Sequence, residues 1–191
     1  MSDSPTTELD IARAIAAGEL PSPTEFQNSR FYKMRVSGTG VAWRNAHREF
    51  CFRPPAVWLS DRMIERVRGL PVIAEHPPFR ATLDGPAFHE RVLGICVLGF
   101  VEGSDLMAVV RVIDKQVAAI LDQCSVDTSP CVQFDPTQNT VVNIGDDELL
   151  IEEEPILLDH LALVTKGVWN RAKDGADVGV EITAEKELEN A

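Results

Sequence analysis

The stretch from residue 31 to about residue 165 consists of short apolar runs that Gly, Pro and clusters of polar residues interrupt. Several of these runs alternate apolar and polar residues, which is the pattern of a strand with one buried face. Many short strands with few helices between them are typical of a β-barrel or a β-sandwich with peripheral helices. The predicted strands cover residues 31–43, 49–52, 70–76, 92–101, 106–113, 126–134, 140–144, 149–151 and 156–165.

Three other segments have the apolar spacing of helices. Two of them follow a residue whose side chain can accept hydrogen bonds from the first turn, as helix caps do. The polar residues 102–105 separate two predicted strands and indicate a hairpin connection. The predicted helices cover residues 8–17, residues 61–68 after Ser60, and residues 115–122 after Asp114.

The length of 191 residues and the hydrophobic content of 45% fit one globular domain with small appendages. We expect residues 1–29 to form an N-terminal arm and residues 30–170 to form the domain. From Arg171 onward the chain becomes polar, and we expect residues 171–191 to form an acidic C-terminal tail.

The formal net charge of −12 repels phosphate groups, so we expect no binding to nucleic acid through a basic patch. No apolar run approaches the roughly 18 residues that span a bilayer, and the acidic N-terminus does not resemble a secretory signal. We therefore expect no membrane contact and a location in the cytoplasm. The four cysteines form no CxxC pair, so we interpret them as buried thiols and expect neither a metal nor a cofactor.

Three of the predicted strands each place a residue with catalytic potential on one face. Alternation puts His76 on one face of its strand, Ser129 on one face of the next, and His160 on one face of the last. Asp159 falls on the opposite face from His160 by the same alternation. Because both faces of the last strand are otherwise apolar, we expect it to be buried and its polar pair to have partners.

A serine becomes a nucleophile when an imidazole within hydrogen-bond reach takes its proton. The imidazole in turn needs a third group that holds it in one tautomer. A second imidazole can do this as well as a carboxylate, with weaker electrostatic support. Spacing alone also fits ordinary roles, namely core histidines for His76 and His160 and a strand-end serine for Ser129.

Five short blocks of the sequence are informative because of the order in which they occur. They are Phe52-Arg53-Pro54-Pro55, residues 69–77 (GLPVIAEHP), residues 88–94 (FHERVLG), residues 128–132 (TSPCV) and residues 159–164 (DHLALV). This arrangement resembles a phage and prophage family encoded in head-gene clusters, and the resemblance covers roughly residues 30–170. That family is itself similar to the phage prohead proteases and distantly to the herpesvirus assemblins.

The resemblance implies a mainly β fold with peripheral helices, a herpesvirus-protease-like closed barrel of about seven strands. It implies a serine endopeptidase whose catalytic residues occur in the order His76, Ser129, His160, with Asp159 as the alternative third member. By the same resemblance the substrates are phage scaffold and capsid-protein segments inside the assembling prohead in the bacterial cytoplasm, and the protein's own tail. The backbone amides of Lys166 and Gly167 are candidates for the oxyanion hole, and a homo-oligomer is left open.

One departure from the family is Pro130-Cys131, where many relatives have a Gly-aromatic pair after the serine. It favours the first alternative, a catalytically inactive head scaffold or structural protein of the same fold. A second alternative is a cysteine hydrolase that uses Cys131 or Cys124 with His76. The third is a zinc site built from His76, His89, His160 and a cysteine, although the sequence has no compact ligand motif of the HExxH or CxxC type.

Overall fold

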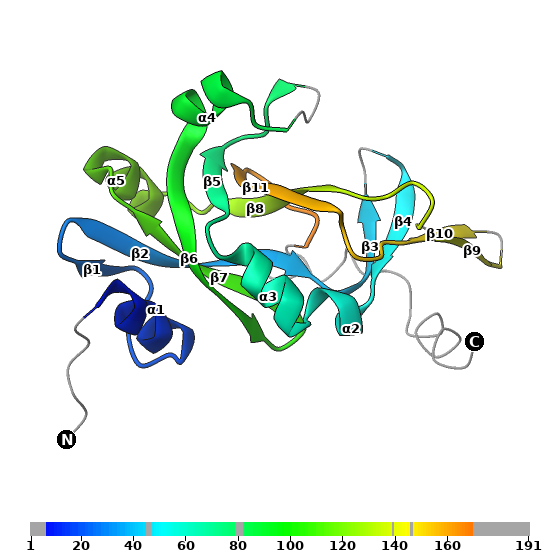
Figure 1. Cartoon of the computed structure of the whole chain (residues 1–191), viewed down its shortest axis with the longest axis horizontal. Helices are drawn as coiled ribbons and strands as arrows, with labels where there is room; N and C mark the ends of the chain where they lie inside the picture. The colour runs from blue at the N-terminus through cyan, green and yellow to red at the C-terminus, as the bar shows by residue number, and fades with distance from the viewer. Residues whose placement is uncertain (1–6, 45–46, 79–81, 139, 146, 170–191) are drawn as a thin grey trace.

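The computed structural model describes residues 7–44, 47–78, 82–138, 140–145 and 147–169 (Figure 1). Over these residues the protein is mainly β, with helices at the periphery of the strands. The helices are α1 (Glu8–Ala16), α2 (Pro55–Trp58), α3 (Asp61–Val67), α4 (Gly85–Arg91) and α5 (Lys115–Gln123). None of the helices in this part of the chain is long and apolar enough to cross a membrane.

A seven-stranded sheet forms the body of the fold, in the order β1-β2-β7-β6-β5-β11-β8. Neighbouring strands are antiparallel except β5 and β11, which run parallel. Its strands are β1 (Thr24–Phe26), β2 (Ser29–Gly38), β5 (Pro71–Ala74), β6 (Val92–Glu102), β7 (Asp105–Val112), β8 (Asp127–Gln133) and β11 (Leu157–Val164). Strand β11 therefore lies between β5 and β8, the two strands that carry or lead to the other predicted catalytic residues.

A second sheet of four strands has the order β3-β4-β10-β9. It explains why the strand predicted over residues 31–43 is two strands: β2 ends at Gly38 and β3 begins at Gly40, whose φ of 86° redirects the chain. Glycine adopts this left-handed conformation without steric cost. The strands are β3 (Gly40–Arg44), β4 (Glu49–Arg53), β9 (Thr140–Ile144) and β10 (Asp147–Ile151).

The alternation of β7 distributes its side chains to two apolar clusters. Leu106, Ala108, Val110 and Val112 join the main core, which also contains residues of α3 and β11. Val109 joins a smaller cluster with the apolar residues of α1. The segment expected to be an N-terminal arm is thus packed on the sheet through α1 and paired with it through β1.

The two predicted helix caps are confirmed. The Ser60 hydroxyl accepts a hydrogen bond from the Met63 amide, and the Asp114 carboxylate accepts from the first turn of α5. The sequence patterns missed β1, α2 and α4, which have at most seven residues each. Such short elements provide too few residues for a period to be recognised.

The predicted closed barrel is not found: over the described residues, no ladder joins β8 to the other end of the seven-stranded sheet. The two ends of the sheet do approach each other, because the Thr128 hydroxyl on β8 donates a hydrogen bond to the Arg35 carbonyl on β2, the strand next to the end strand β1. The predicted tail, residues 171–191, lies outside the described residues.

Candidate active site

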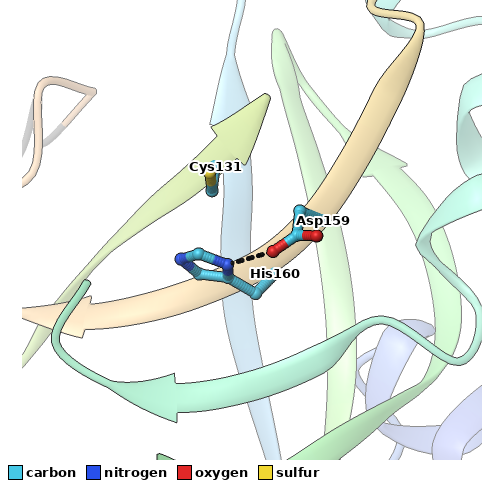
Figure 2. Close-up of side chains that lie close together, drawn as sticks. All are labelled: Cys131, Asp159 and His160. Carbon is cyan, nitrogen blue, oxygen red and sulfur yellow. Dashed lines mark hydrogen bonds and ion pairs between the residues drawn. The ribbon is translucent and has the colours of Figure 1, made fainter. Parts of the chain in front are cut away.

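A β-bulge in β11 brings Asp159 and His160 to the same side of the strand. Leu158 pairs with Val132 of β8 and His160 pairs with Cys131, so Asp159 is the extra residue. The Asp159 carboxylate oxygen Oδ2 lies 2.6 Å from Nδ1 of His160, as Figure 2 shows. The prediction that alternation places Asp159 on the opposite face is wrong, because a bulge shifts the alternation by one residue.

Two donors hold the Asp159 carboxylate in place. Besides Nδ1 of His160, the backbone amide of Leu83 donates to Oδ2 over 2.9 Å. The His160 side chain is 0% exposed and that of Asp159 is 13% exposed. A buried polar pair with these contacts satisfies its hydrogen bonds, as the apolar surroundings of β11 require.

The His76 ring reaches His160 from the other side. Strand β5 ends at Ala74, and the next residue, Glu75, has a φ of 58°, an unusual value for a residue other than glycine. Nδ1 of His76 lies 2.9 Å from Nε2 of His160, with the two rings tilted by 55°. His76, His160 and Asp159 thus form one hydrogen-bonded chain, which we call the relay.

The relay fixes the tautomers of both histidines. An ionised carboxylate only accepts hydrogen bonds, so Nδ1–H of His160 donates to Asp159 and Nε2 of His160 accepts. His76 must then donate through Nδ1–H. The lone pair of neutral His76 is consequently on Nε2, as a general base requires.

Ser129 and His76 line the same pocket, which has a volume of about 320 Å³. Ser129 pairs with Ala162 of β11, and Cys131, two residues further along β8, pairs with His160. Cross-strand partners and alternate residues of one strand share a face of the sheet. Ser129 and Cys131 therefore lie on the face where His160 meets His76.

Two arginines from the second sheet also line this pocket, and the sequence patterns did not identify them. Arg53 donates from Nε to Oε2 of Glu152 over 2.6 Å, and Arg44 binds the other oxygen of the same carboxylate. The Glu152 side chain is 0% exposed, and the Arg53 guanidinium lies 4.0 Å from the centre of the Trp58 ring. Arg44 also binds Glu49, so the two arginines and the two glutamates form one ion-pair network along this wall of the pocket.

One of the two oxyanion-hole candidates, the Gly167 amide, has another hydrogen-bond partner. The Gly167 amide donates to Oδ2 of Asp127 over 3.0 Å, and Gly167 lines a separate cavity of about 350 Å³. A Cβ at this position would lie 2.4 Å from the Thr128 carbonyl oxygen, which explains the glycine. This arrangement commits the Gly167 amide to Asp127 and corrects its expected role; the role of Lys166 stays a prediction.

The cysteines occupy distinct environments. Cys131 is buried and lines the pocket with His76, whereas Cys124 is exposed and lines the separate cavity. Cys51 also lines the pocket, but burial and the nearby Glu152 carboxylate raise its pKa to about 11, which keeps it a neutral thiol. Of the two cysteines considered as nucleophiles, only Cys131 shares the pocket of His76 in the part of the chain described.

The zinc-ligand set considered as the third alternative is not the cluster that forms in the described residues. His89 lies exposed on α4 and does not belong to the cluster that forms. Instead the potential ligand atoms of Cys131, Asp159 and His160 all lie within 4.8 Å of one another (Figure 2). His47 is exposed and also lines the pocket.

Comparison with models of protein families, with curated proteins and with solved structures found no match to this chain. The resemblance to phage head-maturation proteases stays a prediction. What the site can do chemically is therefore inferred from the contacts of its own side chains.

Proposed function

We propose that this protein is a serine endopeptidase with Ser129 as nucleophile, His76 as general base and His160 as the third member of the triad. The observation that carries the proposal is the relay, which ends at His76 in the pocket that Ser129 lines. A hydrogen-bonded chain of two imidazoles and a carboxylate is the type of arrangement that holds a general base in one tautomer.

In the proposed reaction the Ser129 hydroxyl attacks a peptide carbonyl, and its proton moves to Nε2 of His76. The tetrahedral intermediate collapses when His76 gives this proton to the leaving amine, which breaks the C–N bond and leaves an acyl-serine. A water molecule then attacks the ester, with His76 again as base, and the acid product and free Ser129 are released.

Asp159 is assigned a positioning role in this reaction, behind His160 and not in its place. Protonated His76 donates a hydrogen bond to His160, and His160 donates through its own Nδ1–H to Asp159. The carboxylate therefore supports an imidazolium that a neutral histidine alone would support weakly. The two candidates for the third member act in series.

The biological setting is proposed from the resemblance of the sequence blocks. The substrates are scaffold and major capsid protein segments, and the reaction takes place in the assembling prohead. The finer fold prediction, a herpesvirus-protease-like barrel, belongs to the same proposal. Its support is the number of strands in the large sheet and the hydrogen bond between Thr128 and Arg35, which joins its two ends.

Labelling with a fluorophosphonate probe, followed by peptide mapping, tests the proposal directly. We expect labelling at Ser129, and its loss in Ser129→Ala and His76→Ala. Ser125→Ala is the matched control, because Ser125 lies four residues earlier and lines the separate cavity. Co-expression with neighbouring head genes and mass spectrometry of the products would then identify substrates.

A folded protein that neither reacts with the probe nor cleaves the scaffold or capsid protein would overturn the proposal. That result would favour the inactive head protein. Labelling by a thiol-specific reagent at Cys131, with loss of hydrolysis in Cys131→Ala and normal hydrolysis in Ser129→Ala, would identify a cysteine hydrolase instead.

A further inference from the structure

Three side chains beside the relay combine the ligand types that zinc prefers. Cys131 of β8 pairs directly with His160 of β11, and the bulge adds Asp159 to the same cluster. Their potential ligand atoms all lie within 4.8 Å of one another. Thiolate, imidazole and carboxylate are the three classes of protein ligand found at zinc sites. Figure 2 shows Cys131 and Asp159 beside the His160 ring, whose Nδ1 contacts Asp159.

We propose that Cys131, Asp159 and His160 bind a zinc-type divalent ion, and that the bound ion switches the relay off. The binding site stands on the cluster alone. The inhibitory effect rests on the proposed function, because it concerns the tautomer that His76 needs as a base.

The geometry requires only side-chain adjustments. Metal–ligand distances of roughly 2.0–2.3 Å place the ligand atoms of a tetrahedral site about 3.3–3.8 Å apart. The 2.6 Å distance between Nδ1 of His160 and Oδ2 of Asp159 would lengthen, and the widest separation in the cluster would shorten by up to about 1.5 Å. Cys131 lines the pocket, which gives the ion an entry route and room for water as the fourth ligand.

The charges of the cluster match a divalent cation. A thiolate and a carboxylate together carry two negative charges, which neutralise the ion in surroundings where an unpaired charge is costly. His160 is 0% exposed and Cys131 is 8% exposed, so the site is shielded from solvent. The sulfur and nitrogen ligands favour zinc and similar transition metals over Mg²⁺ and Ca²⁺, which prefer oxygen.

Metal binding would reverse the tautomers of the relay. An ion that replaces the proton on Nδ1 of His160 leaves the other ring proton on Nε2, which then donates to Nδ1 of His76. His76 must carry its own proton on Nε2 and can no longer accept one from Ser129. Coordination through Nε2 of His160 would instead break its contact with His76. The first mode removes the general base, and the second removes the group that orients it.

Titration of the full chain with Co²⁺ tests the site independently of activity. We expect one equivalent to produce a thiolate-to-cobalt absorption band, with Zn²⁺ displacing the cobalt. Cys131→Ser should abolish the band and weaken Zn²⁺ binding, measured by calorimetry, at least ~100-fold. Asp159→Asn should weaken binding ~10–100-fold.

Cys124→Ser is the matched control, because it removes an exposed thiol outside the cluster. A band that persists in Cys131→Ser, or disappears in Cys124→Ser, would overturn the site. Cys131→Ala provides a second variant if the serine variant fails to fold, with thermal unfolding as the check on both.

The ratio of peptide hydrolysis with and without Zn²⁺, taken within each variant, tests the inhibition. We expect at least ~10-fold inhibition of the wild-type protein, reversed by a chelator, and less than ~2-fold inhibition of Cys131→Ser. Equal inhibition of both proteins would overturn the switch. Cobalt binding without any hydrolysis would overturn the proposed protease and leave the metal site standing; hydrolysis without cobalt binding would do the reverse.

Discussion

Nδ1 of His76 lies 2.9 Å from Nε2 of His160, although 84 residues separate the two histidines in the chain. Strand β11 makes this contact by pairing with β5 on one side and β8 on the other. The same arrangement puts Ser129 and His76 in one pocket. The order His76, Ser129, His160 along the sequence is therefore matched by proximity in the fold.

The histidine variants should rank by their distance from the reaction. We expect His76→Ala to reduce kcat/KM by ~10³-fold or more, as does Ser129→Ala, because each removes a group that handles the transferred proton. His160→Ala should have an intermediate effect, since water can replace part of an orienting group. His89→Ala should keep kcat/KM near the wild-type value, because His89 is exposed on α4. Equal activities across the series would contradict the assignment.

Asp159→Asn should reduce kcat by ~10–10²-fold, less than His76→Ala does, with a smaller change in KM. An asparagine NH2 group turned toward Nδ1 of His160 must donate there, which reverses the tautomer of His160. Turned toward the Leu83 N–H, it faces another donor and leaves that amide without an acceptor. Steady-state kinetics on a peptide substrate measure this split. The control is Asp84→Asn, which changes an exposed helix cap of α4 and should leave kcat unchanged.

Glu152→Gln should lower the free energy of unfolding by ~3–5 kcal/mol, because the buried Arg53 guanidinium loses its carboxylate partner, whereas Arg44 keeps Glu49. Chemical denaturation measures the change. Glu154→Gln is the matched control: Glu154 binds Arg62 and Arg66 near the surface, so its loss should cost about 1 kcal/mol or less. A similar cost for both variants would show that the buried cluster has no special role.

The stability of the protein should fall as pH rises from about 10 to about 12. Burial, followed by the hydrogen bond to Asp122, raises the pKa of Tyr32 to about 12 from its ordinary value of 10.0. Because the folded value is the higher one, the stabilisation is complete below pH 10 and is lost as pH approaches the folded pKa.

Denaturation of the wild type and Tyr32→Phe across this range measures the contribution. Between pH 10 and pH 12 the difference in free energy of unfolding between the two proteins should change by about 1–2 kcal/mol, less than the full pKa shift would give, because solvent screens the hydroxyl. The buried thiols also titrate in this range, because burial raises the pKa of Cys96 to about 12. The comparison with Tyr32→Phe separates the tyrosine from them, and parallel curves would contradict the prediction.

Local features were predictable from the sequence. The caps at Ser60 and Asp114 depend on hydrogen bonds within one helical turn, and the hairpin at residues 102–105 depends on adjacent strands. Most strands were located within a few residues by their apolar runs. His76, Ser129 and His160 were singled out by alternation together with the resemblance, and the structure places His76 with His160 in the relay and with Ser129 in the pocket.

Other features depend on contacts between distant parts of the chain. The bulge at Asp159 exists because β11 must pair with β8 while keeping both Leu158 and Leu161 in the main core. Alternation assumes a regular strand, so it placed Asp159 on the wrong face. Likewise, nothing in the sequence distinguishes Arg53 and Glu152 from ordinary polar residues, and only tertiary packing buries them together beside the half-buried Arg44. Patterns in the sequence report the period of a single element, whereas the register between strands and the pairing of buried charges are decided by packing in three dimensions.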